Sequence, residues 1–118
     1  MTRWLVFAVA ALACTQSRPA TELAKPLPAA VYVHNENFAD VTVYLIRSGA
    51  RFRLGTVHTM ATETYPIDDT PNPIRVLAVA FGSGEQFATE ELVVRTGQRL
   101  DVTVAGMMSL SSYMLLSQ

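Results

Sequence analysis

Two short stretches, VTVYLI at residues 41–46 and LDVTV at residues 100–104, decide the fold that this sequence predicts. In both, valine or leucine recurs at every second position, and mostly polar residues fill the positions between. A period of two places alternate side chains on opposite faces of a β-strand. Each stretch therefore predicts a strand with one buried face and one face in water.

The same alternation predicts strands along most of the chain after residue 30. They fall at residues 31–34, 51–54, 62–67, 74–81 and 86–94. The stretch 74–81 is apolar on both faces and suits a central strand, whereas Pro66 favours an edge position for 62–67. Sequences rich in Gly, Asn, Asp and Pro separate these strands and predict turns.

A single open sheet would leave the apolar face of every strand in water, so the strands must form two sheets packed face to face. We predict an all-β fold, an antiparallel Greek-key β-sandwich of about seven strands over residues 30–118. Immunoglobulin-like and transthyretin-like sandwiches both fit, and a small closed barrel is the alternative. The two-residue alternation of apolar side chains does not specify which strands are neighbours in each sheet.

The composition bounds the function classes. The chain has 118 residues and a net charge of -1 with no basic run, so nucleic-acid binding is not expected. One cysteine and two histidines supply neither a disulfide framework nor a three-histidine zinc site, and we expect no metal and no cofactor.

Residues 1–13 have the pattern of a secretory signal peptide: Arg3, an apolar run at 5–12, and the small residues Ala11 and Ala13. The run is shorter than the roughly 20 residues of a transmembrane helix. The alternative is a buried N-terminal helix of the domain.

The sequence Ala11-Leu12-Ala13-Cys14 resembles a bacterial lipobox. The resemblance implies cleavage between Ala13 and Cys14, diacylation of the Cys14 sulfur, acylation of the new amino terminus, and membrane binding through these chains. Thr15 after the cysteine then implies the outer membrane of a two-membrane bacterium. Alternatively, ordinary signal peptidase cuts after Ala13 and releases a secreted or periplasmic soluble protein with a free thiol.

Residues 14–29 contain three prolines and no periodic apolar face, which predicts an extended tether between Cys14 and the domain. A short helix over residues 21–25, packed on the domain, is the alternative.

The C-terminal stretch after Asp101 carries no charge, and it predicts a last strand that docks along a sheet edge. A flexible, methionine-containing strip can instead receive a partner. The candidate partner surface comprises Met108, Leu110, Tyr113, Met114 and Leu116.

Two other groups of residues suggest chemistry weakly. His34 could act in a hydrolase if Glu36 or Asp40 oriented it, but no Gly-x-Ser-x-Gly motif supplies a nucleophile, so we interpret His34 and His58 as surface residues.

The oxygen-rich stretch 68–72 could bind calcium or form an acidic turn.

Four arginines could share one sheet face with Tyr32 or Tyr44 and bind an anionic glycan or peptide. A solvated face protected from edge pairing by its charge is the alternative. The arginines are Arg47, Arg51, Arg53 and Arg75.

Residues 41–104 resemble small sandwich modules of the bacterial envelope, of the carboxypeptidase-regulatory or PEGA kind. The resemblance rests on the strand at 41–45, on Leu54-Gly55-Thr56, and on the turn Thr96-Gly97-Gln98 with the strand after it. The whole chain is also similar to uncharacterised small bacterial lipoproteins with such a domain. These resemblances imply a non-catalytic surface or periplasmic module and supply no catalytic residues.

We therefore expect a non-catalytic, lipid-anchored protein of the bacterial envelope that serves as a binding or assembly accessory, with an envelope protein or a glycan as partner. The alternative is a secreted structural or adhesive subunit that associates through an edge strand.

Overall fold

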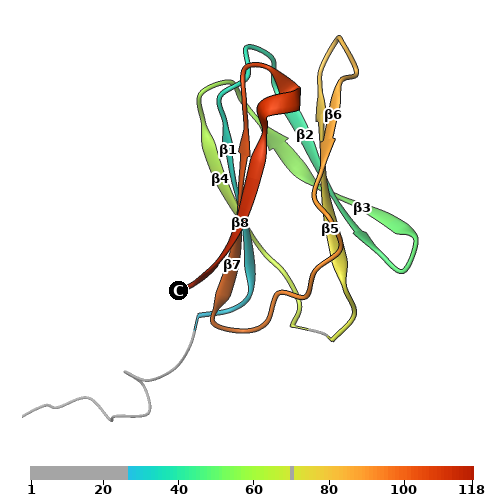
Figure 1. The fold of residues 1–118 in the computed structure, drawn as a ribbon, viewed down its shortest axis with the longest axis vertical. Helices are drawn as coiled ribbons and strands as arrows, with labels where there is room; N and C mark the ends of the chain where they lie inside the picture. Colours follow the sequence, from blue (N-terminus) through green and yellow to red (C-terminus); the bar gives the residue numbers. More distant parts are fainter. Residues whose placement is uncertain (1–26, 70) are drawn as a thin grey trace, which may run out of the picture.

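A computed structural model describes residues 27–69 and 71–118 of the chain. Eight strands form two four-stranded sheets that stack face to face (Figure 1). The first sheet, called the β1 sheet, has the order β4 (Thr62–Pro66), β1 (Ala30–Asn35), β7 (Gln98–Val104), β8 (Ser112–Ser117). The second, called the β2 sheet, has the order β3 (Ala50–Val57), β2 (Val41–Arg47), β5 (Ile74–Ala80), β6 (Gln86–Ala88). The predicted all-β sandwich is confirmed.

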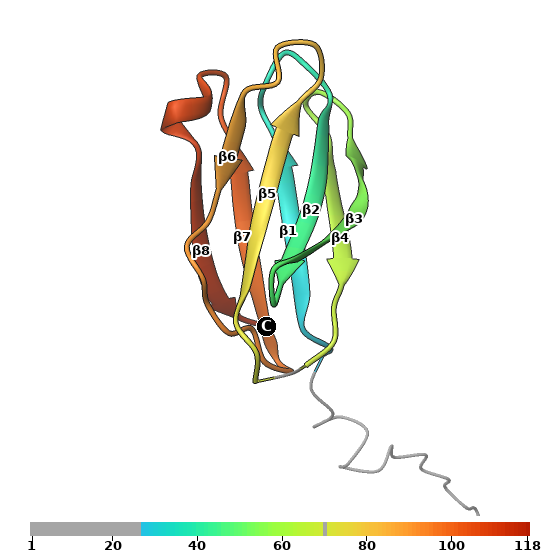
Figure 2. The same cartoon turned by 90° about the vertical axis from the view of Figure 1, so that its right-hand side faces the viewer.

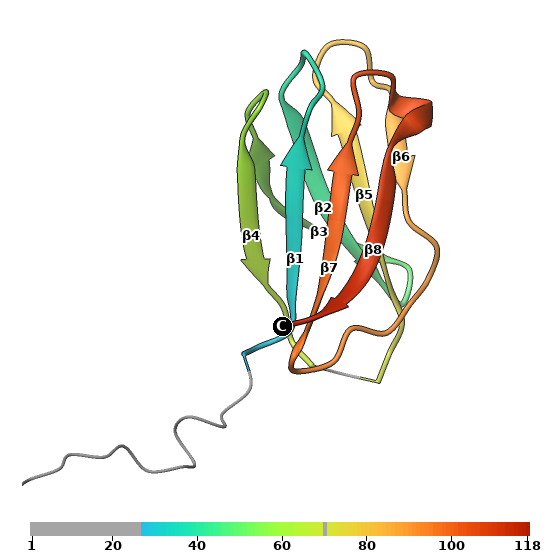
Figure 3. The same cartoon turned by 60° about the vertical axis from the view of Figure 1, so that its left-hand side comes forward.

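One strand pair departs from the predicted antiparallel arrangement. β1 and β7 run parallel, with Val31 opposite Leu100 and Val33 opposite Val102, whereas every other pair of neighbouring strands is antiparallel (Figure 3). Parallel neighbours need a long crossover. The chain between β1 and β7 supplies it by building the β2 sheet and β4 on the way.

The strand predicted at 86–94 is wrong in extent, because regular pairing of β6 ends at Ala88. The hydroxyl oxygen of the buried Thr89 accepts a hydrogen bond from the Val76 amide at 3.0 Å, while the Thr89 amide donates to the Val76 carbonyl at 2.9 Å. A side-chain atom thus takes the place of a backbone acceptor and interrupts the ladder. Pairing returns only at Leu92, which forms an isolated bridge with Ile74.

In Figure 2 the β2 sheet lies in front of the β1 sheet. Valines from both sheets fill the space between them. β-Branched side chains pack well on a pleated surface and lose little rotamer freedom there, which suits a core made of strands. The fully buried valines are Val31, Val33, Val41, Val43, Val57, Val76, Val102 and Val104. Their alternation along β1, β2 and β7 is the period that the sequence displays.

Two buried asparagines close one end of the sandwich. Asn35 ends β1, and its side-chain amide donates to the carbonyls of Ala39 at 2.9 Å and Val57 at 3.0 Å. Its side-chain oxygen accepts from the Asn37 amide at 2.8 Å. Asn37 in turn donates to the Ala105 carbonyl at 3.0 Å. These bonds join β1 to the end of β3 and to the loop after β7, so they hold the two sheets together at this end.

The first described residues belong to the domain, although the sequence assigned them to the tether. Ala29 is buried, and its carbonyl accepts from the Ile67 amide at 2.9 Å. The carbonyl of Leu27 accepts from Gly97 at 2.7 Å, and that of Pro28 accepts from the Gln118 side chain at 2.8 Å. The predicted signal peptide, Cys14 and the rest of the tether lie outside the described residues.

Replacing Asn35 with alanine should destabilise the domain by about 3 kcal/mol, because it leaves the Ala39 and Val57 carbonyls and the Asn37 amide buried without their partners. Urea unfolding followed by fluorescence measures the change. Asn72→Ala, at an exposed position, is the matched control and should change the free energy of unfolding by less than about 0.5 kcal/mol. Equal effects of the two substitutions would contradict the role of the Asn35 network.

Candidate functional site

The lipidation site expected at Cys14, with cleavage after Ala13, lies outside the described residues. Within the ranges that the structure describes, no helix is long and apolar enough to cross a bilayer.

The expected partner surface at the C-terminus is not one continuous surface. Met108 begins a short 3-10 helix, η1 (Met108–Leu110), and its side chain is only 6% exposed within the core. The prediction that Met108 is part of the partner surface is therefore wrong. Leu110, at the other end of η1, is 68% exposed. Met108 and Leu110 are two residues apart and would share a face in a continuous strand, but the chain bends into η1 before β8 begins.

The final strand docks on the sheet edge, as the sequence predicts, and its side chains divide between two faces. Tyr113 points inward, where its ring lies 6.3 Å from that of Phe87 and its hydroxyl donates to Glu90 at 3.3 Å. Met114, 59% exposed, and Leu116 pair with Asp101 and Arg99 on the outer face of the β1 sheet.

The four sheet edges differ in how they are protected from pairing with another strand. β4 ends in Pro66 and carries Glu63, β3 carries two arginines, and β6 is three residues long. Each of these features discourages strand addition. β8 is six residues long, has the sequence SYMLLS, and contains neither a charge nor a proline. Among the described strands, β8 is the unprotected edge.

Each histidine is paired with a carboxylate. His34 Nε2 lies 3.1 Å from Glu36 and its Nδ1 lies 2.7 Å from the Thr62 hydroxyl, an ordinary cross-strand neighbour. His58 Nδ1 lies 3.2 Å from Asp40, and the hydrogen bond with His58 is the main reason that the pKa of Asp40 lies below its usual value. Both histidines lie on open surface, as the sequence suggested.

The oxygen-rich stretch after β4 contacts the loop before β7. The Asp69 carboxylate accepts from Arg95 Nε at 2.5 Å and from the Thr96 amide at 2.8 Å. Hydrogen bonds from the side chain and backbone of Thr96, and then from Arg95, lower the pKa of Asp69 to about 2. In the described part of the chain, no group of three or more His, Cys, Asp and Glu residues could hold a metal ion. The contacts of Asp69 favour the structural interpretation of this loop over the calcium alternative.

Three of the four expected arginines come together on the outer face of the β2 sheet. Ile46 of β2 pairs with Arg51 of β3 on one side and with Arg75 of β5 on the other. Arg53 of β3 pairs with Tyr44 of β2. The Arg51 guanidinium carbon lies 5.1 Å from the centre of the Tyr44 ring.

The other two residues proposed for this face lie elsewhere. Arg47 has the inward parity of Val41, Val43 and Leu45. Tyr32 is on the other sheet, where its ring lies 4.7 Å from the Arg99 guanidinium carbon.

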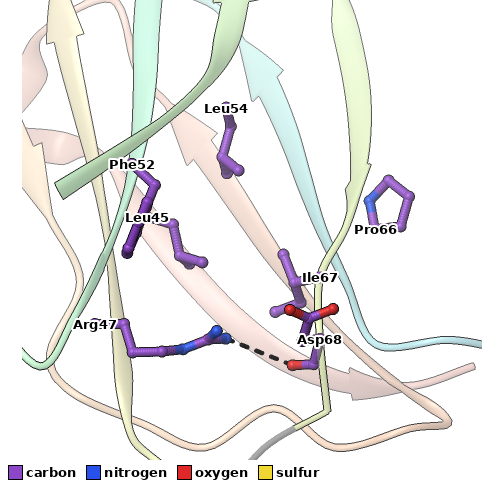
Figure 4. A pocket seen from close by; sticks show the side chains of 7 residues that line it. All are labelled: Leu45, Arg47, Phe52, Leu54, Pro66, Ile67 and Asp68. Atoms are coloured by element: carbon purple, nitrogen blue, oxygen red, sulfur yellow. Dashed lines mark hydrogen bonds between the residues drawn. The ribbon is translucent and has the colours of Figure 1, made fainter. Parts of the chain in front are cut away.

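A pocket of about 300 Å³ lies between the sheets at the edge formed by β3 and β4 (Figure 4). Its walls are Leu45, Arg47, Phe52, Leu54, Pro66, Ile67 and Asp68. Arg47 reaches across the pocket mouth toward the Asp68 carbonyl, 3.5 Å away. The pairing of β2 with β3 shifts beside Tyr44 and leaves Leu54 without a partner residue on β2. Sequence alternation does not reveal such a bulge, so this pocket was not predicted.

The geometry defines a two-sheet β-sandwich whose exposed features are the unprotected β8 edge, three outward arginines on the β2 sheet and a small pocket. No protein-family model matches this chain, and no curated protein matches it either. A solved structure described as the NMR structure of the protein from Eubacterium rectale is similar to it, with a TM-score of 0.52 and 12% sequence identity. The match covers 80% of this chain and 92% of that one, and it shows likeness of fold.

The Asp69 contacts predict a specific acid sensitivity. The folded-state pKa of about 2 lies below the ordinary 3.8, so the stabilisation is present above pH 4 and is lost as the pH falls toward 2. We expect the urea midpoint of the unchanged protein to decrease over this window and that of Asp69→Asn to decrease less. Glu85→Gln, in the exposed turn before β6, is the control and should follow the unchanged protein. Parallel curves for Asp69→Asn and the unchanged protein would contradict the assignment.

Proposed function

We propose that this protein is a non-catalytic module of the bacterial envelope, anchored through acylated Cys14, that binds a partner at the free edge of β8. The anchor is supported by the order of leader, cysteine and proline-containing tether in the sequence. About 12 residues separate Cys14 from the domain at Leu27, and in an extended conformation they reach about 37 Å. The sandwich can therefore stand off the membrane and contact another envelope component.

The observation that carries the binding role is the unprotected β8 edge. An exposed edge offers unpaired backbone donors and acceptors, and an extended segment of a partner can add to it as a further strand. Met114 and Leu116 on the outer face give such a segment apolar contacts beside the backbone pairing. An envelope protein with an extended segment fits this edge better than a glycan, which lacks a peptide ladder.

The second candidate is a secreted structural or adhesive subunit that associates through the same edge. Polymer growth requires two different complementary surfaces on each subunit, whereas one self-complementary edge closes into a dimer. The protection of β3, β4 and β6 provides no second free edge within the described residues. This difference favours the accessory role.

A hydrolase using His34 is the weakest candidate. His34 lies between Glu36 and Thr62, but His34 and Thr62 are on an open sheet face and Glu36 is an exposed residue of the loop after β1. Thr62 begins β4 whereas Pro66, which lines the pocket, ends it, so the two sites are about 13 Å apart along the strand. A nucleophile needs a site where substrate can be held beside it, and the pocket does not provide one for Thr62.

Of the two sandwich types that the sequence allowed, we infer the transthyretin-like one. An immunoglobulin constant-type sandwich places its first two strands side by side in one sheet of order A-B-E-D. Here β1 lies between β4 and β7, and β2 lies in the other sheet. This strand order supports a relation to carboxypeptidase-regulatory modules at the level of fold.

The anchor is tested by Cys14→Ala. Fractionation of cells should move the variant from the membrane to the soluble fraction, because the acyl chains supply the membrane affinity. Thr15→Ala retains the cysteine and should stay with the membrane. Intact mass spectrometry of the native protein should show loss of residues 1–13 and added acyl mass. An uncut, unacylated chain would overturn the anchor.

The binding edge is tested by photo-crosslinking in intact cells from a reactive residue at position 112, at the start of β8. We expect a discrete adduct with an envelope protein that Met114→Lys removes, because a lysine on an edge strand opposes strand addition. Met107→Lys, at a residue 65% exposed just before η1, is the matched control and should retain the adduct. An adduct of twice the chain mass would indicate self-association instead, and retention of the adduct in Met114→Lys would contradict the edge.

A further inference from the structure

The strands of the β2 sheet carry charge of one sign. They contain Arg47, Arg51, Arg53 and Arg75 and neither aspartate nor glutamate. The ion pairs of the described arginines lie elsewhere: Arg95 pairs with Asp69, and Arg99 pairs with Asp101. Among the described residues, the four arginines of the β2 sheet therefore have no carboxylate within 4.0 Å.

The outer three of these arginines form a compact cationic face. Arg51 and Arg75 flank Ile46 in one row across the sheet, so their α-carbons are about 10 Å apart. Arg53 lies in the next row beside Tyr44, and Arg51 stacks over that ring. We call the set Arg51, Arg53 and Arg75 the arginine face.

A projecting hairpin with an uncharged turn adjoins this face. The hairpin between β2 and β3 extends away from the body of the sandwich (Figure 1), and its turn is Ser48-Gly49. Both turn residues have positive φ, 52° and 77°, which fixes a tight reversal. Phe52, three residues after Gly49, is 52% exposed.

We propose that the arginine face and this hairpin bind the anionic headgroups of a phospholipid membrane. This inference rests on the proposed anchor, because a domain tethered through Cys14 stays near the bilayer. The described residues carry nine acidic side chains and six arginines, so their net charge is negative and anionic lipid repels the domain as a whole. Salt screens charges beyond about 10 Å, and the face nearest the bilayer then determines the attraction. Each arginine close to such a surface strengthens binding about fivefold.

Phe52 is the reason to favour a membrane over a soluble polyanion such as an acidic glycan. Arginines attract either ligand, but an exposed ring beside an uncharged turn gains most when it enters the interface between headgroups and acyl chains. The ring is on the inward side of β3, at the rim of the pocket, whereas Arg51 and Arg53 are on the outer side. Because β3 is the edge strand of its sheet, the ring and both guanidinium groups reach the bilayer together when this edge lies against it.

The test uses the domain of residues 27–118, which contains both sheets and the whole core cluster and lacks the acylation site. Circular dichroism checks its fold. Sedimentation with vesicles of 30% phosphatidylglycerol and 70% phosphatidylcholine should show binding that weakens with salt and is absent on pure phosphatidylcholine. Arg51→Gln with Arg75→Gln should reduce the partition coefficient about 25-fold. Arg99→Gln, on the other sheet, should change it less than twofold.

Phe52→Ser separates the two kinds of ligand. It should weaken vesicle binding severalfold while leaving binding to heparin, a soluble polyanion, unchanged. No vesicle binding, or equal loss in Arg99→Gln and the double variant, would overturn the proposal, and so would heparin binding without vesicle binding. Because this domain lacks Cys14, its result is independent of acylation: failure here leaves the anchor intact, and failure of the anchor leaves this result intact.

Discussion

The side chain of Asn35 is the contact on which the closed end of the sandwich depends. It ends a strand of one sheet and donates to the carbonyl that ends β3 in the other, so one residue bridges the two layers. Through Asn37 the same network reaches the loop after β7. A buried polar network of this kind contributes most when every member is paired. Packing of the valines is non-directional, so it holds the sheets together without specifying how they are aligned. The hydrogen bonds of Asn35 and Asn37 specify which strand ends meet.

The alternation of apolar residues predicted the sandwich because burial of one strand face leaves a direct trace in the sequence. The same trace says nothing about which strands become neighbours, so the parallel pairing of β1 with β7 was not predictable. It also fails where a side chain replaces a backbone partner, as Thr89 does, and where a chain bends between two apolar residues, as it does between Met108 and Met114.

The exposed features were predictable to different degrees. Arg51, Arg53 and Arg75 share a face because they lie on paired strands with matching parity, whereas Arg47 is on the opposite parity of its own strand. The pocket lies beside the bulge at Leu54, and its walls come from β2, β3 and the end of β4 in the other sheet. It depends on how these distant segments pack together, so local pattern cannot reveal it. The uncharged final strand was predicted to lie at a sheet edge, and the sheet order adds that the other three edge strands, β3, β4 and β6, are the protected ones.

The last residue of the chain lies beside the first residues of the domain. Gln118 donates to the Pro28 carbonyl, and its amide donates to Gly97, which itself donates to Leu27. Adjacent termini permit a chain to be circularly permuted, with a short peptide joining the old ends and new ends opened at an exposed turn. The Ser48-Gly49 turn suits such an opening, and the tether could then be moved from one flank of the sandwich to another without altering its core.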